Sequence, residues 1–575
     1  MTLPAALQRL RLAGRRPAGE VLERPYERLL LPGATLAGVG LLVWLALPTV
    51  WWSPLNVDEE LTLRLAQFSF GDILHIVSTQ RGGGPLHFWL ERFLLEQWSG
   101  LPALRVPSLV FACLALAGVA LVARRLIGAP GAAAVVVLTA ASPVPVLYAT
   151  FGRPHTMLFA WITWSTVATL RAADGGGRGW WIAGGFLLGA SVFVHPTAPL
   201  YALTAFAAAV LYAPAPLRVV VRDAWAGLAA LLVTFVPYYV ETLHVLGDRY
   251  GVGGPAHGRT FSGRPVWEDA LRFVAPGGHD LNVFTALAAL GAAALAFGRR
   301  RRTLAFCALM VAAPVVFFTV VPASGTSALF FDRYMIPATP AFLTAAVAGC
   351  LTIAGRAGRF EWPVLALLVA ALLAVELWSA RDHRNLVHRV DVDAIVHAAE
   401  RLPHGTVLFG STGTRGAQWS SFDYGHPPTI LDHLVALRVR SLALVDDDSC
   451  RRVLPFLDGP RTPRLGAWLF VAAEPEQLAR ASHAFAGVRG VTAATGAGRY
   501  SLVRSRGPVP PRALLRLGRE LRLRWKRAVP ENARVDELLR ADDQLLSRPR
   551  TCAPYGDLGD PDISPHWPPL PGPHR

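Results

Sequence analysis

Trp51-Trp52-Ser53-Pro54-Leu55-Asn56-Val57-Asp58-Glu59-Glu60 opens a charged stretch that runs to residue 105 and decides how the chain folds. It lies between two apolar segments, residues 31–50 and 106–123, neither of which contains a charged residue. Segments of this length can cross a bilayer. We therefore predict that residues 51–105 form a loop at a membrane surface, where retained charges indicate a functional site. An ordinary solvated loop with two surface helices is the alternative.

The composition excludes an ordinary soluble enzyme. Of the 575 residues, 53% are hydrophobic, and the formal net charge is +16. Nearly all of this basic charge is arginine, because Lys526 is the only lysine. The arginines lie mostly between apolar segments and in the last third, so membrane topology and lipid phosphates explain them better than nucleic acid does. The run 31–50 is longer than a signal-peptide core and no Ala-x-Ala site follows it, so we predict a retained first span.

Further apolar runs predict a polytopic membrane protein with about eleven spans of roughly 15–20 residues. These runs are 31–50, 106–123, 131–150, 154–170, 180–194, 198–213, 224–240, 281–298, 303–322, 335–354 and 362–379. His195-Pro196 divides the fifth and sixth runs, which predicts a tight hairpin rather than one long helix.

The distribution of arginines predicts the topology. With a cytoplasmic N-terminus, alternate connections should be arginine-rich. These connections carry Arg124-Arg125, Arg171 and Arg178, Arg218 and Arg222, Arg299 to Arg302, and Arg356 and Arg359. The other connections, which include residues 51–105, 151–153 and 195–197, then face the outside, as does everything after about residue 380.

The chain is thereby divided into four parts. Residues 1–30 form a cytoplasmic arm, residues 31–380 the membrane domain, residues 381–505 an extracytoplasmic α/β domain, and residues 506–575 a basic, Pro-rich tail. In the α/β domain we predict strands at 406–409, 441–445, 465–472 and 500–503, with helices at 387–402 and 474–485. In the tail, Arg512–Arg527 has leucines on one helical face among arginines, which predicts an amphipathic helix that lies on anionic lipid or packs on the α/β domain. Cys450 and Cys552 both fall outside the membrane and could form a disulfide.

Four short motifs resemble the GT-C glycosyltransferases, multispan enzymes that use polyprenyl-phosphate sugars. Val57-Asp58-Glu59 looks like the acidic pair after the first span, and Gly84-Pro85-Leu86-His87-Phe88-Trp89 is similar to the family's Pro-Pro-Leu-Tyr-Tyr-Trp stretch. Gly152-Arg153-Pro154-His155 resembles an Ala-Arg-Pro-Tyr element, and Asp332-Arg333-Tyr334-Met335-Ile336-Pro337-Ala338 looks like the opening of a late span. The resemblance is to members such as the protein O-mannosyltransferases and the lipid A aminoarabinose transferase. The resemblance covers residues 30–380 and implies a GT-C membrane fold, mainly α, with a polyprenyl-phosphate-linked sugar as donor.

The resemblance also implies roles for individual residues. Asp58 is the candidate general base, and Glu59 either orients its surroundings or binds a divalent metal such as Mg²⁺ or Mn²⁺ with it. Arg81, Arg153 and Arg333 are candidates for the donor phosphate. His87, His155 and Tyr334 are candidate substrate-binding residues.

Chemistry supports these residue types. Transfer to a hydroxyl requires a base within hydrogen-bond reach of the attacking oxygen, and the departing phosphate requires cations or donors. The chain departs from the family where Gly82-Gly83-Gly84 replaces a Lys or His, so Arg81 is the substitute cation, with the glycines supplying backbone freedom. Nothing in the sequence completes a metal site, so a metal cofactor stays open.

Alternatives remain at this stage. Arg333 also suits snorkelling to headgroups, His195 suits a helix end, and Tyr238 suits an interfacial aromatic belt. If Asp58 is not the base, Glu59 or an acid in residues 241–280, such as Asp248 or Glu268, is the next candidate. A different lipid-linked glycan polymerase or ligase, or a non-catalytic transporter or scaffold, is the rival function. The favoured function is transfer of a sugar to a lipid, glycan or protein acceptor at the outer face of the cytoplasmic membrane.

Overall fold

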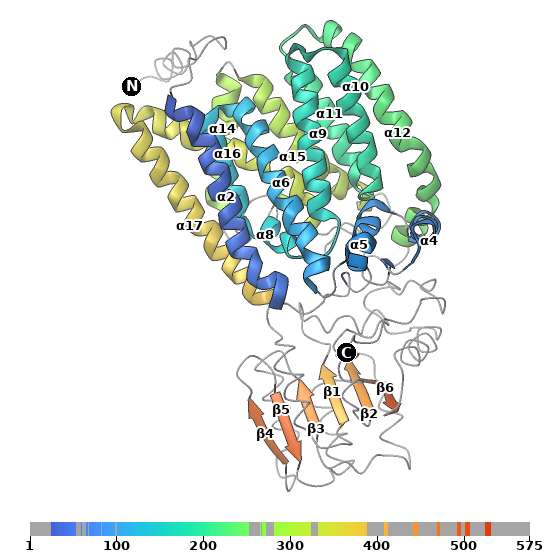
Figure 1. Ribbon diagram of the computed structural model, residues 1–575. Helices are drawn as coiled ribbons and strands as arrows, with labels where there is room; N and C mark the ends of the chain where they lie inside the picture. The colour runs from blue at the N-terminus through green and yellow to red at the C-terminus, as the bar shows by residue number, and fades with distance from the viewer. Residues whose placement is uncertain are drawn as a thin grey trace. The chain divides into compact units, whose positions relative to one another are not determined.

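The computed structural model describes part of the chain, and Figure 1 shows it. The described residues are 25–52, 59, 62, 65–66, 68–81, 83–97, 101–251, 265, 267–268, 270–271, 281–298, 300–323, 332–387 and six strands after residue 400. Contacts divide the chain into two units. The first comprises residues 1–51 and 69–383, and the second comprises residues 52–68 and 384–575.

The described part of the first unit is a bundle of helices, which stand side by side in Figure 1. In chain order they are α2 (Pro25–Trp52), α4 (Phe70–Ile76), η1 (Val77–Arg81), α5 (Leu86–Gln97), α6 (Leu101–Ile127), α7 (Ala129–Ala141), α8 (Pro143–Ala149), α9 (His155–Arg171), η2 (Ala172–Gly176), α10 (Arg178–Ala190), η3 (Ser191–Phe193), α11 (Ala198–Tyr212), α12 (Leu217–Gly251), α14 (Leu281–Phe297), α15 (Arg301–Ala323), η4 (Asp332–Ala338), α16 (Thr339–Arg356), η5 (Gly358–Phe360) and α17 (Glu361–Val387).

Each predicted apolar run coincides with a helix of this bundle, which confirms the mainly α, multispan fold. Among the described residues, six helices are long and apolar enough to cross a membrane, or seven if α7 and α8 form one span bent by 59°. The prediction of about eleven spans is larger because α9, α10, α11 and α14 have only 17, 13, 15 and 17 residues.

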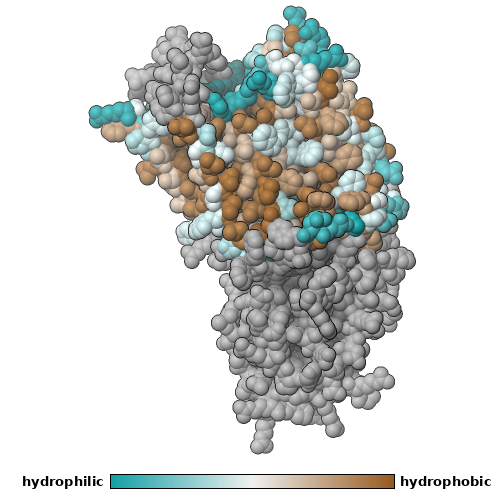
Figure 2. Space-filling view, viewed as in Figure 1, coloured by the Kyte–Doolittle hydropathy of each residue, from teal (hydrophilic) through white to brown (hydrophobic). Residues whose placement is uncertain are grey.

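The surface of the bundle is suited to lipid. Figure 2 shows apolar side chains across its middle and hydrophilic ones towards its ends. Large side chains such as Trp44 and Trp378 are 69% and 78% exposed. A soluble protein would not expose a surface of this kind, whereas lipid tails cover it at no cost.

Glycines bring pairs of helices into close contact. A Cβ atom on Gly185 of α10 would lie 1.9 Å from the carbonyl oxygen of Gly227 on α12. A Cβ atom on Gly291 of α14 would lie equally close, at 1.9 Å, to the carbonyl oxygen of Ala345 on α16. Small residues let helix backbones approach where hydrophobic exclusion of water cannot drive association. At these positions the apolar helices therefore pack by close contact between backbones rather than through large side chains.

Two breaks in the helices place polar residues at one end of the bundle. The α7–α8 bend occurs at Ser142, and α8 is followed by the turn 150–154 and then α9. The predicted hairpin at His195-Pro196 is confirmed, because α10 and η3 end at Phe193 and α11 begins at Ala198. Both turns lie on the predicted outer side of the spans and supply residues of the candidate site.

The second unit contains two small sheets in its described part. The first has the strand order β3-β1-β2-β6, formed by β1 (Val407–Ser411), β2 (Ser441–Asp446), β3 (Trp468–Val471) and β6 (Arg524–Pro530). β1 pairs in parallel with β2 and β3, and β6 pairs antiparallel with β2. The second sheet is an antiparallel pair of β4 (Val491–Thr495) and β5 (Ser501–Ser505).

Four of these strands, β1, β2, β3 and β5, occupy the predicted positions, whereas β4 and β6 were not predicted from the sequence. The predicted amphipathic helix at Arg512–Arg527 is wrong over its last turn, because β6 begins at Arg524 and continues the sheet beside β2. Pairing with β2 outweighs the helical spacing of the leucines there. The rest of that segment, the predicted helices at 387–402 and 474–485, and Cys450 and Cys552 lie outside the described residues.

Candidate active site

Five of the predicted site residues come together at one end of the first unit. Arg153 lies in the turn between α8 and α9, and His155 is the first residue of α9. Arg333 and Tyr334 lie on η4, and His87 lies near the start of α5. Three segments that are far apart in the sequence therefore supply one cluster of basic and aromatic side chains.

The centre of this cluster consists of His155, His195 and Tyr334. The ring centroids of His155 and His195 are 5.1 Å apart, and that of Tyr334 is 6.4 Å from His155 and 5.6 Å from His195. All three side chains are buried. Nε2 of His155 is buried without a hydrogen-bond partner in the described part of the chain. Because buried polar atoms are nearly always bonded, this nitrogen is positioned for a ligand.

η4 is held in place through its backbone. The hydroxyl of Tyr201 on α11 donates a hydrogen bond to the carbonyl oxygen of Tyr334. The ring of Phe318 on α15 stacks on the Tyr334 ring, with centroids 5.6 Å apart and planes at 19°. The Arg333 guanidinium also lies over the Tyr334 ring, with Cζ 5.8 Å from its centroid. These contacts fix where Arg333 leaves the bundle.

Two guanidinium groups act on the histidines. Burial, followed by the charges of Arg153 and Arg333, holds the pKa of His195 well below its usual value. The same two arginines act electrostatically on His155. Like charges disfavour protonation, so His195 is neutral at physiological pH. The positive charge of the cluster is therefore carried by its arginines.

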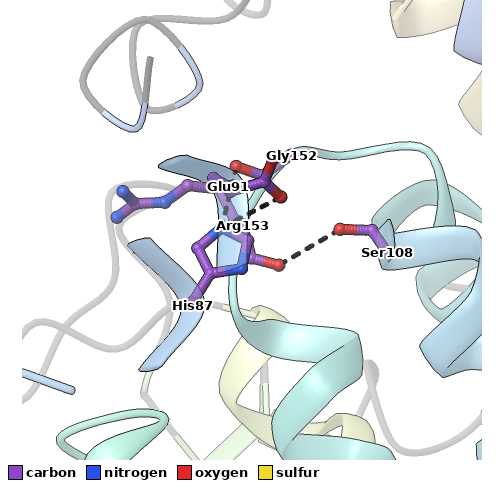
Figure 3. Close-up of polar contacts among 5 residues, drawn as sticks. All are labelled: His87, Glu91, Ser108, Gly152 and Arg153. Atoms are coloured by element: carbon purple, nitrogen blue, oxygen red, sulfur yellow. Dashed lines mark hydrogen bonds and ion pairs between the residues drawn. The ribbon is translucent and has the colours of Figure 1, made fainter. Parts of the chain in front are cut away.

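His87 holds the turn that carries Arg153, as Figure 3 shows. Nε2 of His87 lies 3.3 Å from the carbonyl oxygen of Gly152 and 3.9 Å from Oε1 of the buried Glu91. Burial and the Arg153 charge lower the pKa of His87 to about 3, against the smaller opposing effect of the Gly152 carbonyl. The ring is therefore neutral and donates Nε2–H to that carbonyl. On the other side of the turn, the Ser108 hydroxyl donates to the carbonyl oxygen of Arg153 at 3.3 Å.

The glycine-rich segment, residues 82–84, precedes α5, and its described residues Gly83 and Gly84 contact α12 and the backbone next to the His195 turn. The hydroxyl of Tyr238 on α12 donates a 2.6 Å hydrogen bond to the carbonyl oxygen of Gly83, which has a φ of +134°. A Cβ atom on Gly84 would lie 2.2 Å from the backbone of Phe193. The predicted backbone freedom is confirmed at Gly83, whose φ is in the region that favours glycine. At Gly84 the absence of a side chain has a second effect that was not predicted, because it lets two backbones touch.

The other three predicted site residues are not part of this cluster in the described structure. Arg81 ends η1, and its side chain is outside the described residues. Asp58 is also outside them. Glu59 belongs to the second unit, where it is buried with 1% exposure. Among the described residues, no group of three or more His, Cys, Asp or Glu side chains could hold a metal ion.

The sequence analysis assigned no site role to three residues of this region. His195 suited a helix end, yet its ring lies beside that of His155 in the cluster. Tyr238 suited an aromatic belt, yet it bonds the carbonyl oxygen of Gly83 in the glycine-rich segment. Glu91 received no role, although a fully buried carboxyl at i+4 from a histidine is a recognisable pair on a helix. For His195 no local signal exists, because its neighbours in space come from α9 and η4.

Comparison with known proteins gives one family match. Residues 83–240 match the family model described as Dolichyl-phosphate-mannose-protein mannosyltransferase. The matched range begins in the glycine-rich segment and contains His87, Arg153, His155 and His195. The resemblance to GT-C glycosyltransferases predicted from the motifs is thereby confirmed. A search of curated proteins gives no match.

Solved structures of two kinds are similar. ArnT from Cupriavidus metallidurans in the apo state gives a TM-score of 0.45 at 14% identity, covering 82% of this chain and 98% of that chain. The same protein bound to undecaprenyl phosphate gives a TM-score of 0.46 with the same identity and coverage. The Archaeoglobus fulgidus oligosaccharyltransferase in complex with Zn and sulfate gives 0.40 at 13% identity, covering 72% of this chain and 67% of that chain.

Proposed function

We propose that this protein is a membrane glycosyltransferase that moves a sugar from a polyprenyl-phosphate donor to an acceptor hydroxyl. The observation that carries the proposal is the cluster of two arginines and two buried histidines at the end of a lipid-facing helical bundle. Such a cluster suits a phosphate group whose hydrocarbon tail remains in the bilayer. The family match over residues 83–240 supports the same class of donor.

The reaction assigns a role to each group. The acceptor oxygen attacks the anomeric carbon, its proton passes to the Asp58 carboxylate, and the bond from the anomeric carbon to the phosphate oxygen breaks. The electron pair of that bond leaves with the polyprenyl phosphate, whose growing charge Arg153 and Arg333 stabilise. A single displacement of this kind inverts the anomeric centre. Arg81 is a third candidate cation, and Glu59 is assigned to orienting Asp58 or to binding a divalent cation with it.

Around the cluster, His87 and Glu91 are positioning residues. His87 donates to Gly152, the neighbour of Arg153, so it sets where the guanidinium emerges from the turn. Tyr334 and His155 lie beside each other in the cluster and are candidates for contact with the substrate. Holding donor and acceptor in one geometry supplies much of the rate of such a transfer.

The arginine-rich connections support a location in the cytoplasmic membrane with the N-terminus inside. The cluster then lies at the outer surface, as do the loop 51–105 and the domain 381–505. An acceptor at that surface can be a lipid, a glycan or a protein. The basic tail 506–575 completes the proposed division, after the arm 1–30 and the membrane domain 31–380.

The test is transfer by purified protein from a set of radiolabelled polyprenyl-phosphate sugars, together with binding of undecaprenyl phosphate. We expect Arg153→Gln and Arg333→Gln each to reduce transfer by about 10²- to 10³-fold, as loss of one charge-stabilising donor does elsewhere. Arg356→Gln is the matched control, because Arg356 is exposed at the far end of α16. Wild-type transfer by both arginine variants would refute the phosphate site, and absence of transfer from every donor would refute the function.

A further inference from the structure

His195 lies in the turn between η3 and α11, and its contacts fix which ring nitrogen carries the proton. Nδ1 is 2.8 Å from Oγ1 of Thr197 and accepts a hydrogen bond from the Thr197 backbone N–H at 3.2 Å. A backbone N–H can only donate, so Nδ1 has no proton. The neutral ring therefore carries its proton on Nε2, away from the turn.

The surroundings of His195 keep the ring neutral. The charged or titratable groups that face it from other elements are Arg153, His155, Arg333, His87 and the phenol of Tyr334. None of them is an anion that would stabilise an imidazolium ion. On the ring of His155, 5.1 Å away, Nε2 is buried without a hydrogen-bond partner in the described region. The imidazole beside His195 thus presents hydrogen-bonding capacity that no described protein group satisfies.

We propose that His195 is a neutral hydrogen-bond donor to the donor phosphate, with His155 completing the same subsite and the two arginines supplying all of its charge. This rests on the proposed function and adds a binding residue to it. No proton moves from His195 during transfer: its Nε2–H bonds a phosphate oxygen in the substrate and in the product alike. Thr197 is a positioning residue, because its N–H selects the tautomer that donates.

Two variants of His195 distinguish the roles of its two ring nitrogens. In His195→Gln the amide nitrogen takes the place of Nε2, whereas in His195→Asn the amide reaches only as far as Nδ1. We measure the dissociation constant for undecaprenyl phosphate and kcat/KM for the donor in detergent-solubilised full-length protein. We expect His195→Gln to stay within about tenfold of wild type and His195→Asn to lose roughly 10- to 100-fold, the range for a hydrogen bond to a charged group. His75→Gln is the control, since His75 is exposed on α4.

A second measurement tests neutrality and does not depend on a variant being fully active. A phosphate monoester itself titrates near pH 6, so the readout is the difference between wild type and His195→Gln in binding from pH 6 to pH 8. We expect the two curves to be parallel. A general acid or a cationic ligand at position 195 would weaken wild-type binding by tenfold or more as the pH rises, and His195→Gln would lack this change. That outcome would overturn the proposal.

The other outcomes of the His195 and Arg153 variants each support or refute part of the proposal. Equal losses in folded His195→Gln and His195→Asn would refute the Nε2 donor, and wild-type affinity in both would remove His195 from the site. Arg153→Gln in the same assay distinguishes the two levels of inference. If Arg153→Gln loses binding while the His195 variants do not, only the inference about His195 fails. If neither changes binding, the proposed phosphate site itself is wrong.

Discussion

Substituting Gly84 by alanine tests whether the glycine-rich segment serves close contact rather than flexibility. The added Cβ atom would lie 2.2 Å from the carbonyl carbon and oxygen of Phe193 and 2.4 Å from the nitrogen of Val194. Ordinary contact begins at 3.4 Å, so one of the two backbones must move by about 1.2 Å, the difference between 3.4 and 2.2 Å. The obstacle is main chain, which no rotamer change can relieve.

The displacement reaches the site from both sides. Gly84 lies three residues before His87, and Phe193 lies two residues before His195. Overpacking of this kind costs about 1–3 kcal/mol of stability. A shift of about 1 Å in a positioned group can cost roughly 10²-fold in rate. We therefore expect Gly84→Ala to remain folded in detergent, with a lower melting temperature, and to lose about two orders of magnitude in sugar transfer.

The assay is transfer from the radiolabelled donors, beside a thermal melt of each protein. Gly71→Ala is the matched control in the same loop, because the nearest atom to its added Cβ atom is Ser69 Oγ at 3.9 Å. Adding Phe193→Ala to Gly84→Ala should restore nothing, since the contact is with the Phe193 backbone. If Gly84→Ala transfers sugar and melts as wild type does, the segment does not dock as described and the reasoning fails.

Four further changes have expected outcomes. The pKa of His87 is lowered to about 3 in the folded protein, whereas in the unfolded chain the side chain takes up a proton below about pH 6.5. Stability should therefore fall as the pH drops from 6.5 towards 3. His87→Gln should flatten this part of a profile of melting temperature against pH. Glu376, buried in α17 and bonded by the Ser142 hydroxyl at 3.0 Å, should tolerate Gln without loss of melting temperature, whereas Glu376→Ala should lower it by several degrees. Asp58→Asn should reduce transfer by about 10²–10⁴ in folded protein, and if it does not while Glu59→Gln does, Glu59 is the base. A reporter active only in the cytoplasm and fused after Arg381 should stay silent, and a strong signal would reverse the topology.

The bundle could be predicted because the physical signal for a span is local. A run of about 20 apolar residues needs no partner to be recognised, and each such run proved to be a helix. Two helices shorter than a span, α10 and α11, were also predicted, because His195-Pro196 marks the break between them. The strands β4 and β6 were not predicted. For β6 the reason is that it depends on pairing with β2, which is about 80 residues earlier.

The candidate site was predicted where a motif carries it and missed where geometry does. Arg153 and Arg333 stand in motifs with recognisable neighbours, and the structure brings them near the same two histidines. His195 has no such motif, and its importance comes from the ring of His155 beside it. The close contact at Gly84 was not predicted for the same reason, because the Phe193 backbone that it touches is more than 100 residues away.

The charges of the cluster match the product of the proposed reaction better than its substrate. A polyprenyl-phosphate sugar is a phosphodiester with one negative charge, whereas the departing polyprenyl phosphate approaches two at neutral pH. In the proposed site, two guanidinium groups would stabilise that second charge as it develops. The neutral histidines would add hydrogen-bond donors without adding cations, which would bind the substrate too tightly. Groups that act more strongly on the transition state than on the bound donor raise the rate, whereas uniform binding does not. His87 and His195 are kept neutral by burial and by Arg153, so the arginine that we propose to stabilise the leaving group also affects the protonation of its neighbours.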